Sequence, residues 1–155
     1  MLATVQQIQY VTLVFIIPNK EGNVRFITNY RGTNQKLVRK PCPLPRIGET
    51  MHQLEGFQYA TELDITMGYY TIRLSPASQD MTTIVTEFGK FKYNHLPIGM
   101  YASEDIFQAN IDQLLDNIES FKTYIDDILV LRKNTFEKHI EQLIILSGRL
   151  RAAGL

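Results

Sequence analysis

Tyr124-Ile125-Asp126-Asp127 is followed at once by Ile128-Leu129-Val130-Leu131, so two neighbouring carboxylates stand between two short apolar runs. Runs of this kind are typical of buried strands, and the two aspartates are therefore predicted to lie in the tight turn of a β-hairpin. Adjacent carboxylates repel each other and raise each other's proton affinity unless a cation neutralises them. Because carboxylate oxygens are hard ligands, the pair indicates a site for Mg²⁺ or Mn²⁺.

A third acid strengthens this interpretation. On the pair alone, an ordinary polar turn is the better explanation, because aspartate is common in turns. Asp64, however, lies in a second strand-like run, Glu62-Leu63-Asp64-Ile65, which ends at Gly68. Three carboxylates at strand ends of one sheet could converge on two metal ions. Such ions, about 3.5–4 Å apart, clamp the attacking and the leaving oxygen in phosphoryl transfer.

The composition is that of one compact domain or a part of one. The chain has 155 residues, 45% of them hydrophobic, and its 16 basic and 16 acidic residues cancel. The single cysteine, Cys42, excludes an internal disulfide, and the three histidines lack the spacing of zinc ligands. The longest apolar run, Val11 to Ile17, is far shorter than the ~20 residues of a membrane span. No charged segment precedes it, so we expect neither a membrane segment nor a signal peptide.

The charges are segregated along the chain, which the totals hide. Residues 20–46 contain seven basic residues and one acidic residue, whereas residues 104–127 contain seven acidic residues and one basic residue. Two solvated faces of opposite sign are one explanation. The functional explanation is a basic arm that grips phosphates and an acidic site that holds metals.

Apolar periodicity predicts an α+β fold with a largely antiparallel sheet. Strands are predicted at residues 10–17, 25–30, 57–65, 69–74, 82–88 and 91–94, with a turn at Gly89-Lys90. Prolines 41, 43 and 45 predict an extended connection over residues 36–45. Helices are predicted at residues 46–54, from Ser103 as N-cap to Ile118, and after a capping box of Asn134 and Glu137. The last helix is predicted to turn inward Phe136, Ile140, Leu143, Ile144 and Leu150.

From about Val14 to Leu155 the chain resembles the reverse transcriptases of gypsy-type LTR retrotransposons and their retroviral relatives. The motifs that carry the resemblance stand in the family's order: Val24-Arg25-Phe26-Ile27 with Asn29-Tyr30-Arg31, Pro41-Cys42-Pro43-Leu44-Pro45-Arg46-Ile47, Leu63-Asp64-Ile65-Thr66-Met67-Gly68-Tyr69-Tyr70, Leu96-Pro97-Ile98-Gly99-Met100 with Phe107-Gln108, and Tyr124-Ile125-Asp126-Asp127. Any one of them is weak, but the ordered set is very specific.

The resemblance implies a right-hand polymerase fold, with fingers and palm and an antiparallel sheet that carries helices on one face. Residues 1–155 would be a single fragment, with fingers-like parts at 1–40 and 73–101 and palm-like parts at 41–72 and 102–155. The thumb and RNase H would be absent from this chain and expected in a parent polyprotein. The resemblance also implies an intracellular protein, in a cytoplasmic particle of a retroelement.

The implied activity is RNA-directed DNA polymerisation, in which dNTPs are added to a primer 3′-hydroxyl on an RNA or DNA template. Asp64 and Asp126 would hold two Mg²⁺ or Mn²⁺ ions, with Asp127 as a third carboxylate. The other implied residues contact substrate: Arg25 and Lys20 on the triphosphate, Tyr69 as the gate against a ribose 2′-hydroxyl, Gly99 beside the template base, and Gln108 over the nascent base pair. Exposed cations and a core tyrosine are the ordinary alternatives for Lys20, Arg25 and Tyr69.

The chain departs from the family at Asn29, where the family usually has Asp, and at Ile98, where it usually has Phe. The main departure is Glu104-Asp105, in a stretch where the family has small uncharged residues. Two charges near a path for phosphates would repel substrate, by ~1 kcal/mol each at 4 Å in water. Because the primer grip and thumb of the family would also be absent from this chain, we expect the isolated chain to be a weak or inactive polymerase. The alternative is a catalytically silent remnant that serves as a nucleic-acid-binding or assembly module. A nucleotide cyclase is disfavoured because its Gly-Gly-Asp/Glu-Glu-Phe turn is missing.

Overall fold

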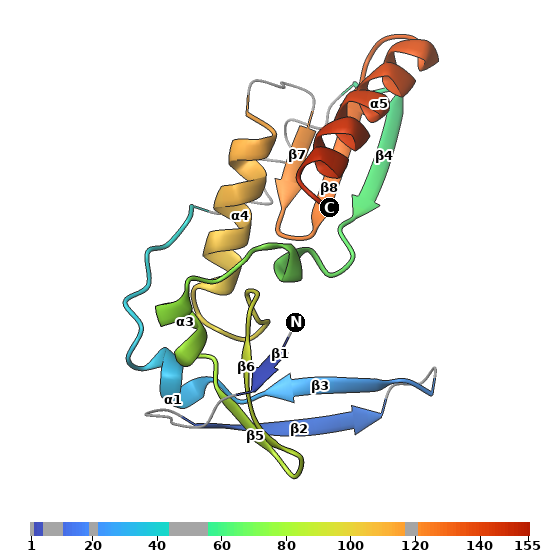
Figure 1. The fold of residues 1–155 in the computed structure, drawn as a ribbon. Coiled ribbons are helices and arrows are strands. Elements are labelled where there is room, and N and C mark those ends of the chain that lie inside the picture. The colour runs from blue at the N-terminus through green and yellow to red at the C-terminus, as the bar shows by residue number, and fades with distance from the viewer. Residues whose placement is uncertain (1, 5–10, 19–21, 44–55, 117–120) are drawn as a thin grey trace. The chain divides into compact units, whose positions relative to one another are not determined.

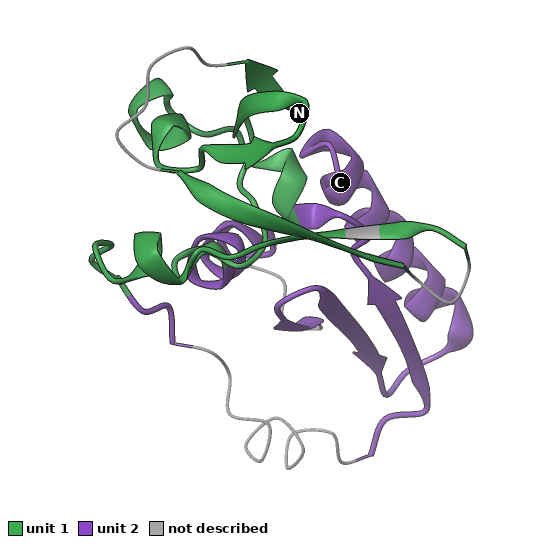
Figure 2. Cartoon of the chain, turned by 90° about the horizontal axis from the view of Figure 1, so that it is seen from below, with its two compact units in different colours: residues 1–40, 69–103 green, residues 41–68, 104–155 purple. Residues whose placement is uncertain are grey.

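The structure is a computed structural model, and it describes residues 2–4, 11–18, 22–43, 56–116 and 121–155. The predicted helix at residues 46–54, Lys20 and Ile118 lie outside these ranges. The chain divides into two compact units, shown in Figure 2: residues 1–40 with 69–103, and residues 41–68 with 104–155. None of the described helices is both long enough and apolar enough to cross a membrane.

The first unit is built on a five-stranded sheet with the order β1-β6-β5-β2-β3 (Figure 1). Its elements are β1 (Leu2–Thr4), β2 (Thr12–Pro18), β3 (Val24–Thr28), α1 (Arg31–Asn34), the 3₁₀ turn η1 (Gly68–Thr71), α3 (Pro76–Asp80), β5 (Ile84–Thr86) and β6 (Gly89–Tyr93). All neighbouring strands are antiparallel except β2 and β5. The predicted hairpin of residues 10–17 and 25–30 is confirmed as β2 and β3, with Phe15 opposite Ile27.

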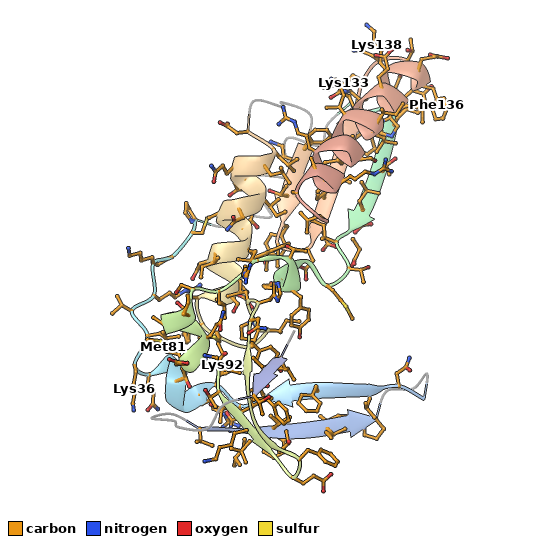
Figure 3. All side chains as sticks on the ribbon, in the orientation of Figure 1. Lys36, Met81, Lys92, Lys133, Phe136 and Lys138 are labelled. Atoms are coloured by element: carbon orange, nitrogen blue, oxygen red, sulfur yellow. The ribbon has the colours of Figure 1, made fainter. Side chains whose placement is uncertain are left out.

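Tyr30 is at the centre of this unit's core. Its side chain is 2% exposed, and its hydroxyl donates to the carbonyl of Thr82 over 3.3 Å. Burial raises the pKa of Tyr30, so the hydroxyl keeps the proton that this hydrogen bond needs. On the surface of the same unit, Lys92 of β6, labelled in Figure 3, forms an ion pair of 2.9 Å with Asp80 of α3.

Two local predictions for this unit are wrong. Residues 69–74 form no strand, because the chain after Gly68 closes into η1, where Ile72 N–H bonds to the Tyr69 carbonyl at 3.3 Å. The turn between β5 and β6 lies at Glu87-Phe88 rather than at Gly89-Lys90. The Thr86 hydroxyl accepts the Phe88 N–H at 3.2 Å and closes the turn there, so Gly89 begins the next strand.

The second unit is a three-stranded antiparallel sheet with the order β4-β8-β7, accompanied by two long helices (Figure 1). Its elements are β4 (Tyr59–Asp64), α4 (Ser103–Leu114), β7 (Phe121–Tyr124), β8 (Asp127–Arg132) and α5 (Phe136–Ala152). The predicted α+β class and the hairpin at the two aspartates are confirmed. Only Asp126 lies in the turn, however, because Asp127, predicted there as well, pairs with Tyr124 and begins β8. Ser103 is the first residue of α4 and donates to the Pro97 carbonyl at 2.7 Å, so its prediction as an N-cap is wrong.

The two faces of this sheet have different surroundings. Strand alternation places Thr61 of β4, its partner Val130 of β8 and Thr123 of β7 on one face. This face contacts both helices, because His139 of α5 bonds to Thr61 at 2.8 Å and Gln108 of α4 bonds to Thr123 at 3.0 Å. The helices therefore cover one face, and the residues that alternate with these three belong to the other face.

The orientation of α5 differs from the prediction. His139 and Leu146 are buried, whereas Ile144, predicted to face inward, is 65% exposed. The hydrogen bond of His139 to Thr61 fixes the rotation of the helix on β4. Phe136, labelled in Figure 3, is half exposed, and its ring is tilted by 58° to that of Tyr59, with the ring centroids 5.6 Å apart. The helix follows Thr135, which makes no side-chain cap, so the predicted capping box is wrong.

Arg149 of α5 ties the two helices of the second unit together. Its Nη1 donates to the carbonyls of Leu114 and Asp116, each at 3.0 Å, at the C-terminal end of α4. The last carbonyls of a helix have no partner within the helix, so a guanidinium that binds them stabilises the helix end.

Gly68 has no room for a side chain. An added Cβ would lie 2.5 Å from the Phe107 ring and 2.9 Å from Ile65 Cγ2, and the Phe107 side chain is 1% exposed. Gly68→Ala is therefore expected to destabilise the fold by about 1–3 kcal/mol through overpacking, as measured by urea unfolding. Gly148→Ala is the matched control, because an added Cβ there meets no atom within 4 Å. At this exposed position of α5, Gly148→Ala should raise the free energy of unfolding by about 0.5–1 kcal/mol. Equal effects of the two substitutions would contradict this account.

Candidate active site

Asp64 and Asp127 are cross-strand neighbours. Asp64 ends β4, Asp127 begins β8, and the two are paired in the antiparallel register. Directly paired residues point to the same face with Cβ atoms about 4.5–5.5 Å apart. Both side chains are exposed, on the face opposite the one that contacts α4 and α5. Beyond the last pair, Ile65 N–H donates to the Asp126 carbonyl at 2.8 Å, so the backbone brings all three aspartates to one end of the sheet.

The turn that carries Asp126 is strained. It consists of Ile125 and Asp126, with Tyr124 and Asp127 as the closing pair. Ile125 has φ 55°, in the left-handed region that a β-branched residue strongly disfavours. Such a conformation costs about 1–3 kcal/mol and persists only where the surroundings impose it. A positive φ at the first central residue of a two-residue hairpin is the signature of a type II′ turn, where glycine is the usual choice.

Asp126 is the most constrained of the three carboxylates. Its Oδ1 is buried, and no group in the described part of the chain forms a hydrogen bond with it. Burial, then Asp64, Asp127 and Glu104, raise the pKa of Asp126 above its ordinary value. A buried carboxylate oxygen without a hydrogen-bond donor, close to other carboxylates, would be stabilised by a bound cation.

The carboxylates suit a divalent cation in their chemistry, although the described side chains are not gathered around one point. Among the described residues, no three His, Cys, Asp or Glu side chains are grouped closely enough to hold a metal ion. The all-oxygen donor set of Asp64, Asp126 and Asp127 nevertheless matches what Mg²⁺ and Mn²⁺ prefer. The partnerless Oδ1 of Asp126 provides a ligand atom that nothing else in the described structure uses.

Glu104 and Asp105 have different surroundings, although both were predicted from the sequence to repel substrate. Asp105 is 4% exposed, and its carboxylate accepts the backbone N–H of Cys42 at 3.0 Å, which fastens the proline-rich connection to α4. Glu104 is exposed and adds to the negative potential at Asp126. The expected repulsion of substrate therefore concerns Glu104, since Asp105 is a buried structural acceptor.

The other predicted site residues lie mostly in the first unit. Gly99 has φ 97°, which requires glycine, and its carbonyl accepts from Asn34 Nδ2 at 3.1 Å. Tyr69 is 7% exposed in η1. Arg25 lies on β3 opposite Ile17, and its side chain is outside the described part of the structure, as is the whole of Lys20.

Gln108 is fully buried in the second unit and forms hydrogen bonds with Asp112, Thr123 and the turn at Ile125. The sequence analysis singled out Gln108 but missed Asp112 and Thr123. The signal for Asp112 was available, because residues four apart on a helix lie on the same side. Thr123 gave no such signal, since its partners come from a different element.

A family profile described as "Reverse transcriptase (RNA-dependent DNA polymerase)" matches residues 17–155. The chain belongs to the reverse transcriptase family. This confirms the resemblance inferred from the ordered motifs, and it identifies the chain as part of a family of RNA-directed DNA polymerases. The match covers all three aspartates of the candidate site.

Two relatives of this reverse transcriptase chain are polyproteins, one from a virus and one from a transposon. It is 32% identical over 138 residues to an "Enzymatic polyprotein" of Cestrum yellow leaf curling virus, which covers 88% of this chain and 22% of that protein. It is 30% identical over 156 residues to the "Retrovirus-related Pol polyprotein from transposon 412" of Drosophila melanogaster, covering 95% of this chain and 12% of that protein. The chain thus spans less than a quarter of these relatives.

Among solved structures, the foamy viral protease-reverse transcriptase in complex with RNA/DNA hybrid superimposes with a TM-score of 0.88. The likeness covers 98% of this chain and 20% of that one at 23% sequence identity. It establishes that the chain has the fold of the corresponding region of a retroviral reverse transcriptase.

Removing the charge of Asp126 is expected to stabilise the metal-free protein. Asp126→Asn should raise the free energy of unfolding at pH 7 in EDTA by roughly 1 kcal/mol, the size of a like-charge contact at about 4 Å in water. Because the pKa of Asp126 is raised by folding, the wild type should gain stability as the pH falls through that pKa, and the variant should lack this gain. Urea unfolding from pH 7 to pH 4 measures both effects.

The control is Asp80→Asn, which removes a carboxylate that is paired with Lys92. This change should leave stability unchanged or lower it by up to about 1 kcal/mol. A loss of stability in Asp126→Asn at neutral pH would show that its charge is compensated in the metal-free fold.

Proposed function

We propose that this chain is the polymerase core of a retroelement reverse transcriptase, which adds dNTPs to a primer 3′-hydroxyl on an RNA or DNA template. The observation that carries the proposal is the pairing of Asp64 with Asp127 beside a buried, partnerless oxygen of Asp126. Membership of the reverse transcriptase family supports it. In this reaction the 3′-hydroxyl oxygen forms a bond to the α-phosphorus, and pyrophosphate leaves.

In this proposal Asp64 and Asp126 hold two divalent ions, with Asp127 as a third carboxylate. When bound, Mg²⁺ or Mn²⁺ would lower the pKa of the primer hydroxyl and neutralise charge on the triphosphate. The carboxylates would hold such ions at this end of the sheet, where the paired Asp64 and Asp127 lie on the face opposite the one that contacts the helices. This placement leaves the exposed face of the sheet for template and primer.

Residues 1–40 and 73–101, which belong to the first unit, are proposed to be the fingers-like part, and residues 41–72 and 102–155 the palm-like part. Arg25 and Lys20 of the β2–β3 hairpin region would bind the triphosphate, by charge and by the bidentate contacts open to arginine. Tyr69 would exclude a ribose 2′-hydroxyl, and Gly99, which has no side chain, would allow a template base to approach its backbone.

The parent protein is proposed to resemble the Pol polyproteins to which the chain is similar, with a thumb and an RNase H region, in an intracellular particle. Because the chain spans 22% and 12% of two such relatives, we expect the isolated 155 residues to extend primers weakly. The foamy viral relative binds RNA/DNA hybrid, which makes a hybrid the appropriate probe for this chain.

The test is extension of a DNA primer on an RNA template by the purified chain, with Mg²⁺ or Mn²⁺ and with dNTPs. We expect slow, metal-dependent addition of the nucleotide that the template specifies. Addition that ignores the template, or extension in EDTA, would refute the proposal.

A silent remnant that only binds nucleic acid is the second candidate. Its support is Glu104, whose exposed carboxylate adds to the charge already present at Asp126. A remnant would bind the RNA/DNA hybrid without metal-dependent extension. Glu104→Gln separates the two candidates, because it should speed extension by an enzyme and leave a remnant inactive.

A further inference from the structure

The strained turn at Ile125 needs a partner that holds it. Its backbone N–H donates to Oε1 of Gln108 at 2.8 Å. Gln108 lies on α4, is completely buried and is separated from Ile125 by 17 positions in the chain. The glutamine side chain therefore ties a helix to the backbone of the residue just before Asp126.

The orientation of the Gln108 amide is fixed by two neighbours. Its Nε2 donates to Asp112 Oδ1 at 2.7 Å and to Thr123 Oγ1 at 3.0 Å. The Thr123 hydroxyl donates in turn to the same Asp112 oxygen at 3.0 Å. An ionised carboxylate can only accept hydrogen bonds, so it attracts the NH₂ end of the amide and repels the oxygen end. The oxygen of Gln108 is thereby directed to the Ile125 N–H.

Asp112 is itself held from a third side. Its Oδ2 lies 3.9 Å from the Cys42 sulfur, within reach of a thiol hydrogen bond. Burial, Asp112 and Asp105 raise the pKa of the Cys42 thiol, which therefore keeps its proton. Both polar atoms of the buried Gln108 amide have hydrogen-bond partners, and these partners hold the amide in one orientation.

We propose that Gln108 is a positioning residue, oriented by Asp112 and Thr123, that fixes the Ile125-Asp126 turn and thereby the placement of Asp126 and Asp127. This inference rests on the proposed function, because the placement of these carboxylates matters only if they hold metal ions. It assigns Gln108 to the support of the site, rather than to the substrate contact that the family resemblance implied.

The test exchanges donor and acceptor across the network in the 155-residue chain. Gln108→Glu places two carboxylates together and removes the NH₂ donor. In the double variant Gln108→Glu with Asp112→Asn, the side chain at position 112 can donate and the one at position 108 can accept, the reverse of the wild type. The readouts are the hydrogen exchange rate of the Ile125 amide, followed by NMR, and the affinity for Mn²⁺.

We expect Gln108→Glu to speed exchange at Ile125 at least tenfold and to weaken Mn²⁺ binding by about 10–100-fold, as loss of a group that orients metal ligands usually does. The double variant should recover most of both losses. Asp112→Ala, at a largely exposed position, should also speed exchange at Ile125, and it keeps the test valid if a buried glutamate prevents folding. Gln113→Glu, exposed on the same helix, is the control for added charge and should leave both readouts unchanged.

Unchanged exchange at Ile125 in folded Gln108→Glu and Asp112→Ala would overturn the inference, as would a double variant no better than the single one. The two readouts distinguish failure of this inference from failure of the proposed function. If the wild type fails to bind Mn²⁺ while exchange at Ile125 follows the expected pattern, the support of the turn stands and the metal site is refuted.

Discussion

Asp126→Asn is expected to lower metal-dependent addition of one nucleotide by about 10³-fold. Asp126 supplies the buried oxygen that no group in the described structure satisfies, and an amide oxygen is a much weaker ligand for a hard cation. Loss of about 4 kcal/mol of charge stabilisation in the transition state corresponds to this factor, since each 1.4 kcal/mol is tenfold in rate. The chain is mixed in excess with a labelled RNA–DNA template-primer, so that a single slow addition is visible.

Measuring stability together with activity distinguishes loss of a metal ligand from loss of folding. Asp126→Asn should be more stable than the wild type in EDTA while it is less active with Mg²⁺, a combination that simple unfolding cannot produce. Asp80→Asn, which carries the same chemical change at a surface ion pair, should extend the primer at the wild-type rate. Equal extension by wild type and Asp126→Asn would remove Asp126 from the active site.

Phe107→Ala is expected to lower the free energy of unfolding by about 3–5 kcal/mol, a large part of the stability of a domain of this size. Phe107 is 1% exposed on α4, and its ring lies against Gly68, in the segment that follows β4. Truncation would open a cavity between α4 and the segment that follows Asp64. Thermal and urea unfolding, followed by circular dichroism, measure the loss.

Phe88→Ala is the matched control, because Phe88 is 83% exposed in the turn between β5 and β6. It should change the free energy of unfolding by no more than about 0.5 kcal/mol. Similar losses in the two variants would mean that Phe107 is not part of a close-packed core.

The sequence predicted the elements that depend on local pattern. The apolar residues after Asp127 predicted β8, and the position of the two aspartates predicted the hairpin. The structure adds that Asp127 belongs to the strand and that Ile125 occupies the turn. An isoleucine with positive φ could not be predicted, because local preference disfavours it and its hydrogen-bond partner Gln108 lies 17 positions away in the chain.

The failures come from contacts between residues distant in the chain. Residues 69–74 have the composition of a strand, yet η1 forms there. The apolar stripe of α5 predicted the wrong buried face, because a polar contact, His139 with Thr61, sets the rotation of that helix. Asp105 looked like an obstacle to substrate until the structure showed its partner, the N–H of Cys42, 63 residues away.

The roles of the candidate site residues rest on the family and on proposals, while their placement comes from the fold. Strand register explains why Asp64 and Asp127 are neighbours. A correct prediction of the β4–β8 pairing from the sequence would have placed them opposite each other. The raised pKa of Asp126 depends on burial and on Glu104 from another element, which no local pattern contains.

The bond between Arg149 and the end of α4 has a practical consequence for anyone who shortens this protein. Deleting the last turns of α5 would remove the guanidinium that holds the carbonyls of Leu114 and Asp116. The helix that supports the aspartate turn would then fray from its far end. Any trimmed version meant to keep a working polymerase site should retain the chain at least through Arg149.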